Sequence, residues 1–123
     1  MMLLVVAVVI AALGLIAHNL ISLPLSPLAP ETVGPVLVYA GLLGWSLRSR
    51  LGSASRWSLA VWALLNVVGG GIVSALPLPF LPFVPDQNLG HHLAHVIYSV
   101  AQLPLLAILV GPKSSWATVR GPS

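Results

Sequence analysis

Charged side chains are scarce in this chain, which has five basic and two acidic residues among 123. A soluble domain carries roughly 25% charged residues, so seven charges are too few to form a water-facing surface. Hydrophobic residues make up 58% of the chain, which excludes intrinsic disorder, because disorder requires low hydrophobicity and high charge. We therefore expect an integral membrane protein in contact with the lipid bilayer.

Cysteine is absent, which excludes disulfides, thiolate metal sites, thiol redox chemistry and cysteine nucleophiles. The net charge is +3, but the bases form no cluster with interleaved aromatic residues, so no nucleic-acid partner is expected. The sequence also lacks a carboxylate pair within one apolar segment, a glycine-rich phosphate loop and a Ser-His-Asp set at compatible depth. We expect no enzymatic activity.

Long apolar segments make up most of the sequence. A membrane-spanning helix needs about 20 mostly apolar residues to cross a hydrocarbon core about 30 Å thick. Four segments approach this length, at about 2–21, 32–47, 57–76 and 89–110, and they leave no room for a soluble domain. The sequence predicts an all-α bundle of four transmembrane helices, arranged as two antiparallel hairpins in one domain over 1–123. The first segment has no preceding Lys or Arg and no small-residue cleavage site, so we expect a retained helix rather than a signal peptide.

The few charges sort by side of the membrane. The connection 48–56 and the tail 111–123 carry all five bases, whereas the proline-rich connections 22–31 and 77–88 carry one acid each. Lys and Arg mark the cytoplasmic side of membrane proteins. We therefore expect both termini in the cytoplasm and the proline-rich loops outside. The composition fits a bacterial origin, and hence the plasma (inner) membrane.

The two proline-rich loops resemble each other. Both read Leu-Pro-Leu, then Pro, two apolar residues, Pro and an acid, which is Glu31 in the first loop and Asp86 in the second. Proline ends the outgoing helix, and an acid is favourable at the positive end of a helix dipole. We expect each acid to open the next helix. The similarity indicates either an internal duplication of a hairpin or independent use of the same signals.

Small residues predict the faces on which the helices pack, because the hydrophobic effect does not drive helices together in lipid. Such residues recur at helical spacing in the first three segments. Three consecutive glycines in the third segment are unfavourable for a helix, so close packing or a local distortion is expected there, with a hinge or pore lining as the alternative. The expected packing residues are Ala7, Ala11, Gly14, Gly34, Gly41, Gly44, Gly69, Gly70 and Ser74.

A polar stripe runs along the fourth segment. At about 100° per residue, its polar side chains cover less than half of the helix, with apolar residues opposite. Such a stripe is expected to face the bundle, a cavity or a partner rather than acyl chains. Pro104 leaves the carbonyl of Val100 without its helical partner, and Gln102 or a water is expected to satisfy it. The candidate binding residues are His91, His95, Tyr98, Ser99 and Gln102, with Asn66 from the third segment.

All four histidines gather at the outer end of the predicted bundle, and three hypotheses remain open for them. They form interhelical hydrogen bonds, or they bind a transition metal or haem, since His91 and His95 share a helix face. The third hypothesis is proton-linked binding or transport, because histidine titrates near neutral pH. The candidate metal ligands are His18, His91, His92, His95 and Asp86.

The sequence favours a non-catalytic function. Four short helices with small-residue faces predict a structural or accessory subunit, either a homo-oligomer or part of a larger membrane complex, without a cofactor. The first alternative is a small transporter or channel that uses the polar stripe. The second is a metal- or haem-binding membrane protein that uses the outer histidines.

Overall fold

The computed structural model describes residues 1–23 and 25–112 of the chain. The two bases and the tryptophan of the C-terminal tail lie outside the described residues. The structure therefore does not test the part of the topology prediction that rests on these two bases. Over the described ranges the chain is helical and contains no strand, which confirms the predicted all-α class. The elements are α1 (Met2–Ser22), α2 (Pro30–Arg48), α3 (Ser53–Leu65), the π-helix η1 (Asn66–Ile72), the 3₁₀ turn η2 (Val73–Ala75) and α4 (Leu89–Val110).

Three helical segments are long and apolar enough to cross a membrane: Met2–Ser22, Ser53–Ala75 and Leu89–Val110. The second of these joins α3, η1 and η2 into one segment of 23 residues. α2 is not among the three, because Glu31, Arg48 and its glycine, serine, threonine and proline residues lower its mean hydropathy. The structure therefore supports a membrane protein, and a fourth span at α2 stays a prediction.

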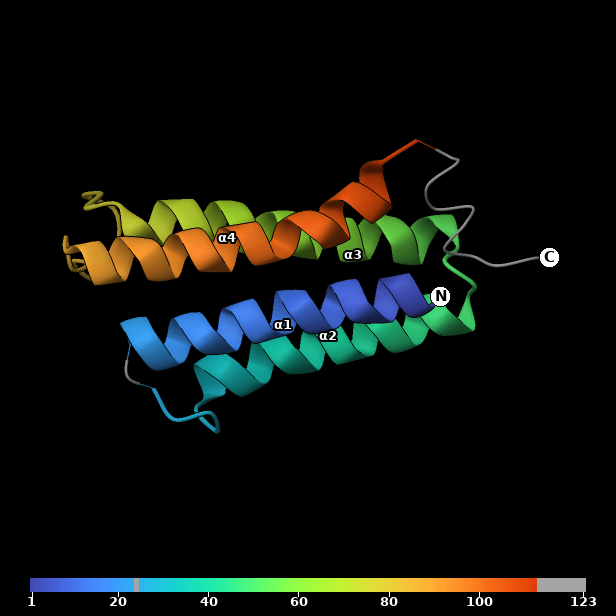
Figure 1. Ribbon diagram of the computed structural model, residues 1–123, viewed down its shortest axis with the longest axis horizontal. Helices are drawn as coiled ribbons and strands as arrows, with labels where there is room; N and C mark the ends of the chain where they lie inside the picture. The colour runs from blue at the N-terminus through green and yellow to red at the C-terminus, as the bar shows by residue number, and fades with distance from the viewer. Residues whose placement is uncertain (24, 113–123) are drawn as a thin grey trace.

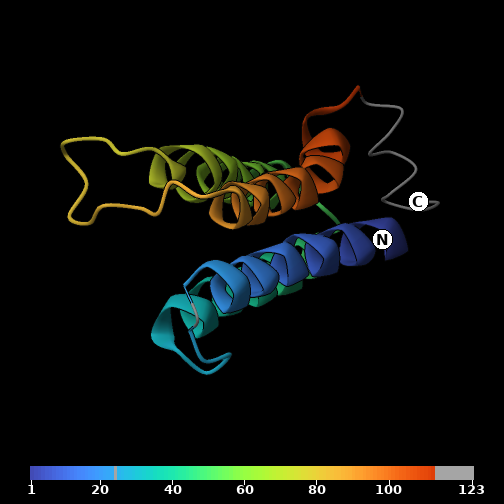
Figure 2. The ribbon, with the colours of Figure 1, turned by 60° about the vertical axis from the view of Figure 1, so that its left-hand side comes forward.

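The four long helices lie roughly along one axis, with α1 beside α2 and α3 beside α4 (Figures 1 and 2). The most extensive contact between helices joins α1 to α4. The segments that join α1 to α2 and η2 to α4 lie at one end of the molecule, which we call the loop end (Figure 1). The N-terminus and the connection between α2 and α3 lie at the opposite end (Figure 1).

Small residues allow α1 to approach α4 closely. Gly14 lies so near α4 that an added Cβ would overlap the Cβ of Ala101, and the carbonyl oxygens of Ile97 and Tyr98 would lie 3.7 Å from it. The other small residues of this face, Ala7 and Ala11, are buried as well. A helix with larger residues at these positions would stand farther from α4, and the polar side chains described below would lose contact.

The glycine run of the third segment lies in the π-helix η1. A single π-helical turn inside a longer helix is a local distortion that often accompanies functional sites. Gly70 lies against the ring of Tyr98, and Gly71 lies against the side chain of Ser99, so neither position has room for a Cβ. The structure thus combines the two expected features, a distortion and close packing. Gly69 does not pack as predicted, because it is exposed and an added Cβ there would meet no atom within 4 Å.

The glycines of α2 contact nothing within the chain. An added Cβ at Gly34, Gly41 or Gly44 would meet no atom within 4 Å, and all three residues are exposed. The buried residues of α2 are Thr32, Tyr39 and Ser46, which occupy the opposite face. The expectation that these glycines pack within the bundle is therefore not met in a single chain, because α2 turns its polar face inward and its glycine face outward.

The prediction that an acid opens each helix after a loop is right for α2 and wrong for α4. Glu31 lies in the first turn of α2. The first turn of α4 contains no acid, and its N-cap is Asn88, whose side-chain oxygen accepts a hydrogen bond of 2.8 Å from the backbone N–H of His91. An asparagine is as good an N-cap as an aspartate. Asp86 therefore remains in the loop, where its side chain lines a pocket.

Candidate functional site

The polar stripe of α4 faces the interior of the bundle. Four of its members are buried, and Ser99 is half-buried with its side chain against Gly71. The opposite face of α4 is exposed and apolar, as expected for a helix that meets lipid on one side. The buried members are His91, His95, Tyr98 and Gln102.

Gln102, the last residue of the polar stripe, joins three helices. Its side chain is fully buried, its oxygen accepts a hydrogen bond from the Tyr39 hydroxyl of α2, and its Nε2 donates to the carbonyl of Ala11 at 3.0 Å. A longer contact of 3.4 Å runs from the same nitrogen to the carbonyl of Tyr98. Because both ends of the amide are engaged in this way, Gln102 does not serve the carbonyl of Val100 as expected.

Tyr98 and Asn66 connect α4 to the π-helix. The Tyr98 hydroxyl donates to Oδ1 of Asn66, and Nδ2 of Asn66 donates to the carbonyl of Trp62 at 2.7 Å. The Tyr98 ring also stacks on His18 of α1, with 5.1 Å between ring centroids and 22° between ring planes. Two of the predicted polar residues thus contact each other directly, and Tyr98 contacts α1 as well.

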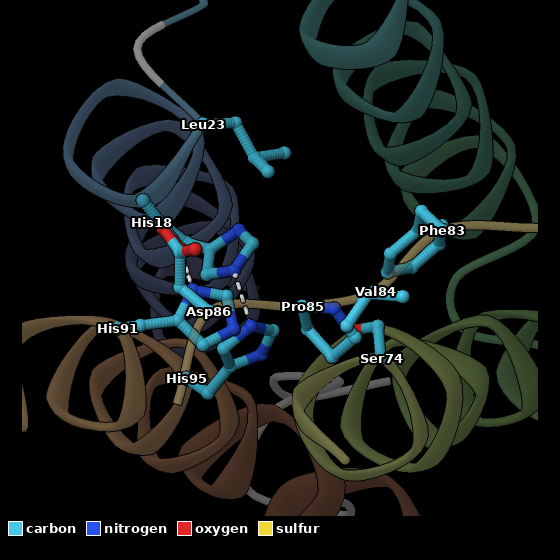
Figure 3. Close-up of a pocket in the computed structure, with 10 residues that line it drawn as sticks. His18, Leu23, Ser74, Phe83, Val84, Pro85, Asp86, His91 and His95 are labelled. Atoms are coloured by element: carbon cyan, nitrogen blue, oxygen red, sulfur yellow. Dashed lines mark hydrogen bonds between the residues drawn. The ribbon is translucent and has the colours of Figure 1, made fainter. Parts of the chain in front are cut away.

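His18 and His95 form the centre of the polar network. Their Nε2 atoms lie 3.1 Å apart (Figure 3). Nδ1 of His95 lies 2.9 Å from the carbonyl oxygen of Gly70. Nδ1 of His18 lies 3.1 Å from Oδ1 of Asn19. The Nδ2 of Asn19 then donates to the carbonyl of Glu31 and to the hydroxyl of Thr32. This chain of contacts crosses η1, α4, α1 and α2.

His91 is the third histidine of the network, and His92 stands apart. The His91 ring lies 4.4 Å from the His95 ring, measured between centroids, and its Nδ1 contacts the hydroxyl of Ser22 at 2.6 Å. Its Nε2 is buried and has no hydrogen-bond partner within residues 1–23 and 25–112. His92 is 6.0 Å from His91 between ring centroids and, together with His95, lines a second groove beside Ser99. Three of the four histidines therefore line the loop-end pocket, and His92 does not.

A cavity of about 300 Å³ lies at the loop end, beside the three histidines (Figure 3). This volume is at the small end of the range for ligand pockets, which is about 300–1,000 Å³. The segment before α4 closes one side of the cavity, and α1 and α4 form the other. Its lining residues are His18, Ser22, Leu23, Ser74, Phe83, Val84, Pro85, Asp86, His91 and His95.

The candidate metal ligands do not form a coordination site in this structure. Within residues 1–23 and 25–112, no group of three or more His, Cys, Asp or Glu side chains is placed to hold a metal ion. A haem iron would need a histidine nitrogen directed at it, whereas the Nε2 atoms of His18 and His95 are directed at each other. The metal and haem hypotheses therefore find no ligand set among the described residues.

Some members of the network were not among the predicted site residues. Ser22 contacts His91, and Tyr39 donates to Gln102. Thr32 accepts a hydrogen bond from Asn19, the neighbour of His18. One signal in the sequence points to the residues of α2, because Thr32, Tyr39 and Ser46 are seven residues apart and so fall on one face of a helix. Ser22 has no such signal, since its partner lies 69 positions later in the chain.

The comparisons with known proteins give no match. The chain matches no protein-family model, and no curated protein or solved structure is significantly similar to it. The function must therefore be inferred from the sequence and from the geometry described above.

Proposed function

We propose that this chain is a non-catalytic membrane subunit that associates with copies of itself through the glycine face of α2. We define the glycine face by the exposed residues Gly34, Leu37, Gly41 and Gly44. The observation that carries the proposal is that this face of α2 is open. No other part of the described chain approaches the three glycines within 4 Å of an added Cβ.

Three glycines elsewhere in the bundle lie at close contacts between helices. Gly14, Gly70 and Gly71 each lie where another helix leaves no room for a Cβ. In lipid, small residues of this kind let two backbones approach, which permits dispersion contacts and interhelical hydrogen bonds. The glycine face of α2 also carries small residues, but no other helix of the described chain packs against these glycines. A second copy of the chain would supply it.

Glycine is an unfavourable choice for a helix face that only meets lipid. Each glycine in a helix interior costs about 1 kcal/mol relative to alanine, and α2 carries three within 19 residues. Gly34 and Gly41 are two turns apart, and Gly44 follows one turn later, so they share one face. The buried residue Tyr39 lies on the opposite face, toward Gln102. The two faces of α2 thus serve different contacts, one inside the chain and one outside it.

The same proposal includes α2 as a fourth span, with both termini in the cytoplasm of a bacterial cell and the chain in the plasma membrane. A helix of 19 residues is about 28 Å long at 1.5 Å per residue, close to the thickness of the hydrocarbon core, which is about 30 Å. Arg48, Arg50 and Arg56 support this orientation, since they lie at the end opposite the loop end. Trp45 and Trp57 are exposed near this end, where amphipathic rings are favoured.

Replacing Gly41 with leucine tests the proposal. A leucine side chain on the glycine face would hold two copies of α2 apart, so we expect the dissociation constant of the oligomer in detergent or nanodiscs to rise at least about tenfold, equivalent to about 1.4 kcal/mol. The measurement is the mass of the particle as a function of protein-to-lipid ratio. The matched control is Ala107→Leu, which places a leucine at an exposed position of α4. A wild-type chain that stays monomeric at every ratio would contradict the proposal.

A second candidate function, a small transporter or channel, is favoured by the pocket at the loop end. The histidines that line this pocket continue into the bundle through Tyr98 and Gln102, so polar groups extend from the pocket toward the middle of the membrane. Buried polar residues of this kind often mark transport paths. Flux of small ions into liposomes, measured as a function of pH, tests this candidate. A flux equal to that of empty liposomes at every pH would exclude it for the ions used.

A further inference from the structure

The hydrogen atoms on His18 and His95 are constrained by the groups around them. The carbonyl oxygen of Gly70 only accepts hydrogen bonds, and it lies 2.9 Å from Nδ1 of His95. Nδ1 of His95 must therefore carry a hydrogen. In a neutral imidazole only one of the two ring nitrogens is protonated. A neutral His95 would accordingly present a bare lone pair at Nε2.

The amide of Asn19 fixes the hydrogen on His18 in the same way. Its Nδ2 donates to the carbonyl oxygen of Glu31 at 3.2 Å and to the hydroxyl of Thr32 at 2.9 Å. Reversing the amide would place two acceptor oxygens against each other at Glu31, so Oδ1 must face His18. Nδ1 of His18, 3.1 Å from Oδ1, is then the donor. A neutral His18 would also present a bare lone pair at Nε2.

The two Nε2 atoms nevertheless lie 3.1 Å apart, which is a hydrogen-bond distance. Two neutral rings carry one N–H hydrogen each, and both hydrogens are used in the contacts with Gly70 and Asn19. A third hydrogen is needed between the rings, and it converts the pair into one imidazolium and one imidazole with a shared charge of +1. We propose that His18 and His95 together form a proton-binding site that takes up one proton from hydronium in the loop-end pocket and leaves water there. This inference does not depend on the association of α2.

The surroundings of the pair are suited to a bound proton. With the proton in place, each of the three ring N–H groups has an acceptor, which are the carbonyl of Gly70, Oδ1 of Asn19 and the facing Nε2. Charge-assisted hydrogen bonds of this kind are stronger than neutral ones. Both rings also line the pocket, so a route for water exists at the loop end (Figure 3).

The titratable groups that face the pair come from α4 and from the loop before it. On α4 these are His91, whose ring lies 4.4 Å from that of His95, and Tyr98, whose ring stacks on His18. The loop contributes Asp86, which lines the same pocket. η1 and α2 present the carbonyls of Gly70 and Glu31, together with the Thr32 hydroxyl.

Proton binding is linked to the contact between α1 and α4, because His18 lies on one helix and His95 on the other. Loss of the proton removes the hydrogen bond between the rings and brings two lone pairs face to face at 3.1 Å. The pair therefore stabilises the contact at low pH, and the stabilisation is lost as the pH rises through the release of the shared proton.

The test is nitrogen NMR of the full chain with ¹⁵N-labelled histidine in lipid nanodiscs, recorded from about pH 4 to about pH 9 around the usual titration range of histidine. At low pH we expect a scalar coupling between the two Nε2 nuclei through the shared hydrogen, and a joint shift of the His18 and His95 signals as one proton leaves. The variant His95→Gln is expected to abolish that joint transition, and His92→Gln, outside the cluster, is expected to retain it.

Two results would overturn the proposal. One is a pair of neutral rings over the whole pH range, each with a single hydrogen and no coupling between them. The other is independent titration of the two rings, with His18 behaving in the His95→Gln chain as it does in the wild type. The wild-type spectra decide the matter even if a variant fails to fold, because the coupling and the joint shift are measured without substitution.

Discussion

Replacing Gly14 with alanine is expected to destabilise the chain by about 1–3 kcal/mol, the usual range for overpacking a close contact. The added Cβ would overlap that of Ala101, so α1 and α4 would have to move apart. This movement would also lengthen the contact between His18 and His95, which joins the same two helices. The measurement is the free energy of unfolding in mixed micelles, by a denaturing detergent titration followed by circular dichroism.

A compensating change and a control make this prediction specific. The double variant Gly14→Ala with Ala101→Gly moves the methyl group from one helix to the other, and we expect it to recover most of the lost stability. The control Gly69→Ala adds the same methyl group at an exposed position where nothing lies within 4 Å and which is not part of the glycine face. We expect it to be neutral or to stabilise the helix, since alanine is the better helix former by about 1 kcal/mol. Equal destabilisation by Gly14→Ala and Gly69→Ala would contradict the packing described here.

Replacing Gln102 with leucine is expected to cost about 2 kcal/mol. Leucine is close in size to glutamine but cannot accept the hydrogen bond from the Tyr39 hydroxyl, which would then be buried without a partner. A buried polar group left unsatisfied costs about 1–3 kcal/mol, and interhelical hydrogen bonds in membranes contribute up to about 1.7 kcal/mol. The measurement is again the free energy of unfolding, compared with Leu103→Ala on the lipid-facing side of the same helix.

The partner variant Tyr39→Phe identifies the bond as the cause. In the chain that carries both Gln102→Leu and Tyr39→Phe, donor and acceptor are removed together, so no hydroxyl remains unsatisfied. We expect the double variant to lose less stability than the sum of the two single variants, with a coupling of about 1 kcal/mol. Additive losses would show that Gln102 and Tyr39 act independently, contrary to the contact between them.

The inward face of α4 could be predicted from the sequence because it depends only on the helical period. Polar residues three and four positions apart fall on one side of a helix, and apolar residues at the remaining positions require that side to avoid lipid. His95, Tyr98 and Gln102 are accordingly buried. The same reasoning placed the small residues of α1 on one face, since Ala7 and Ala11 are four positions apart and both are buried.

The partner of each face could not be predicted, because helical spacing says nothing about which neighbour a face meets. α2 has glycines on one side and a polar stripe of Thr32, Tyr39 and Ser46 on the other. The sequence pointed to the glycine side as the packing face within the bundle. The hydrogen bond between Tyr39 and Gln102, together with the bond between Thr32 and Asn19, turns the polar side inward instead.

The details of the loop end depend on atoms far apart in the sequence. Asp86 and Asn88 are both suitable N-caps, and the choice between them places the aspartate in the pocket rather than in the helix. The hydrogen count on His18 and His95 depends in turn on the carbonyls of Gly70 and Glu31, which come from two other elements. Sequence spacing brought the histidines to one end, but their hydrogen bonds required the fold.

The central claim, association of copies through the glycine face of α2, is tested most directly by cysteine cross-linking in native membranes. The chain has no cysteine, so a single Leu37→Cys substitution on that face reports only contacts between copies. A disulfide forms when the two Cβ atoms approach to about 3.5–4.5 Å. We predict a disulfide-linked dimer for Leu37→Cys and none for Leu103→Cys, which places a thiol on the exposed face of α4. Equal cross-linking at the two positions, or none at Leu37→Cys, would contradict the account.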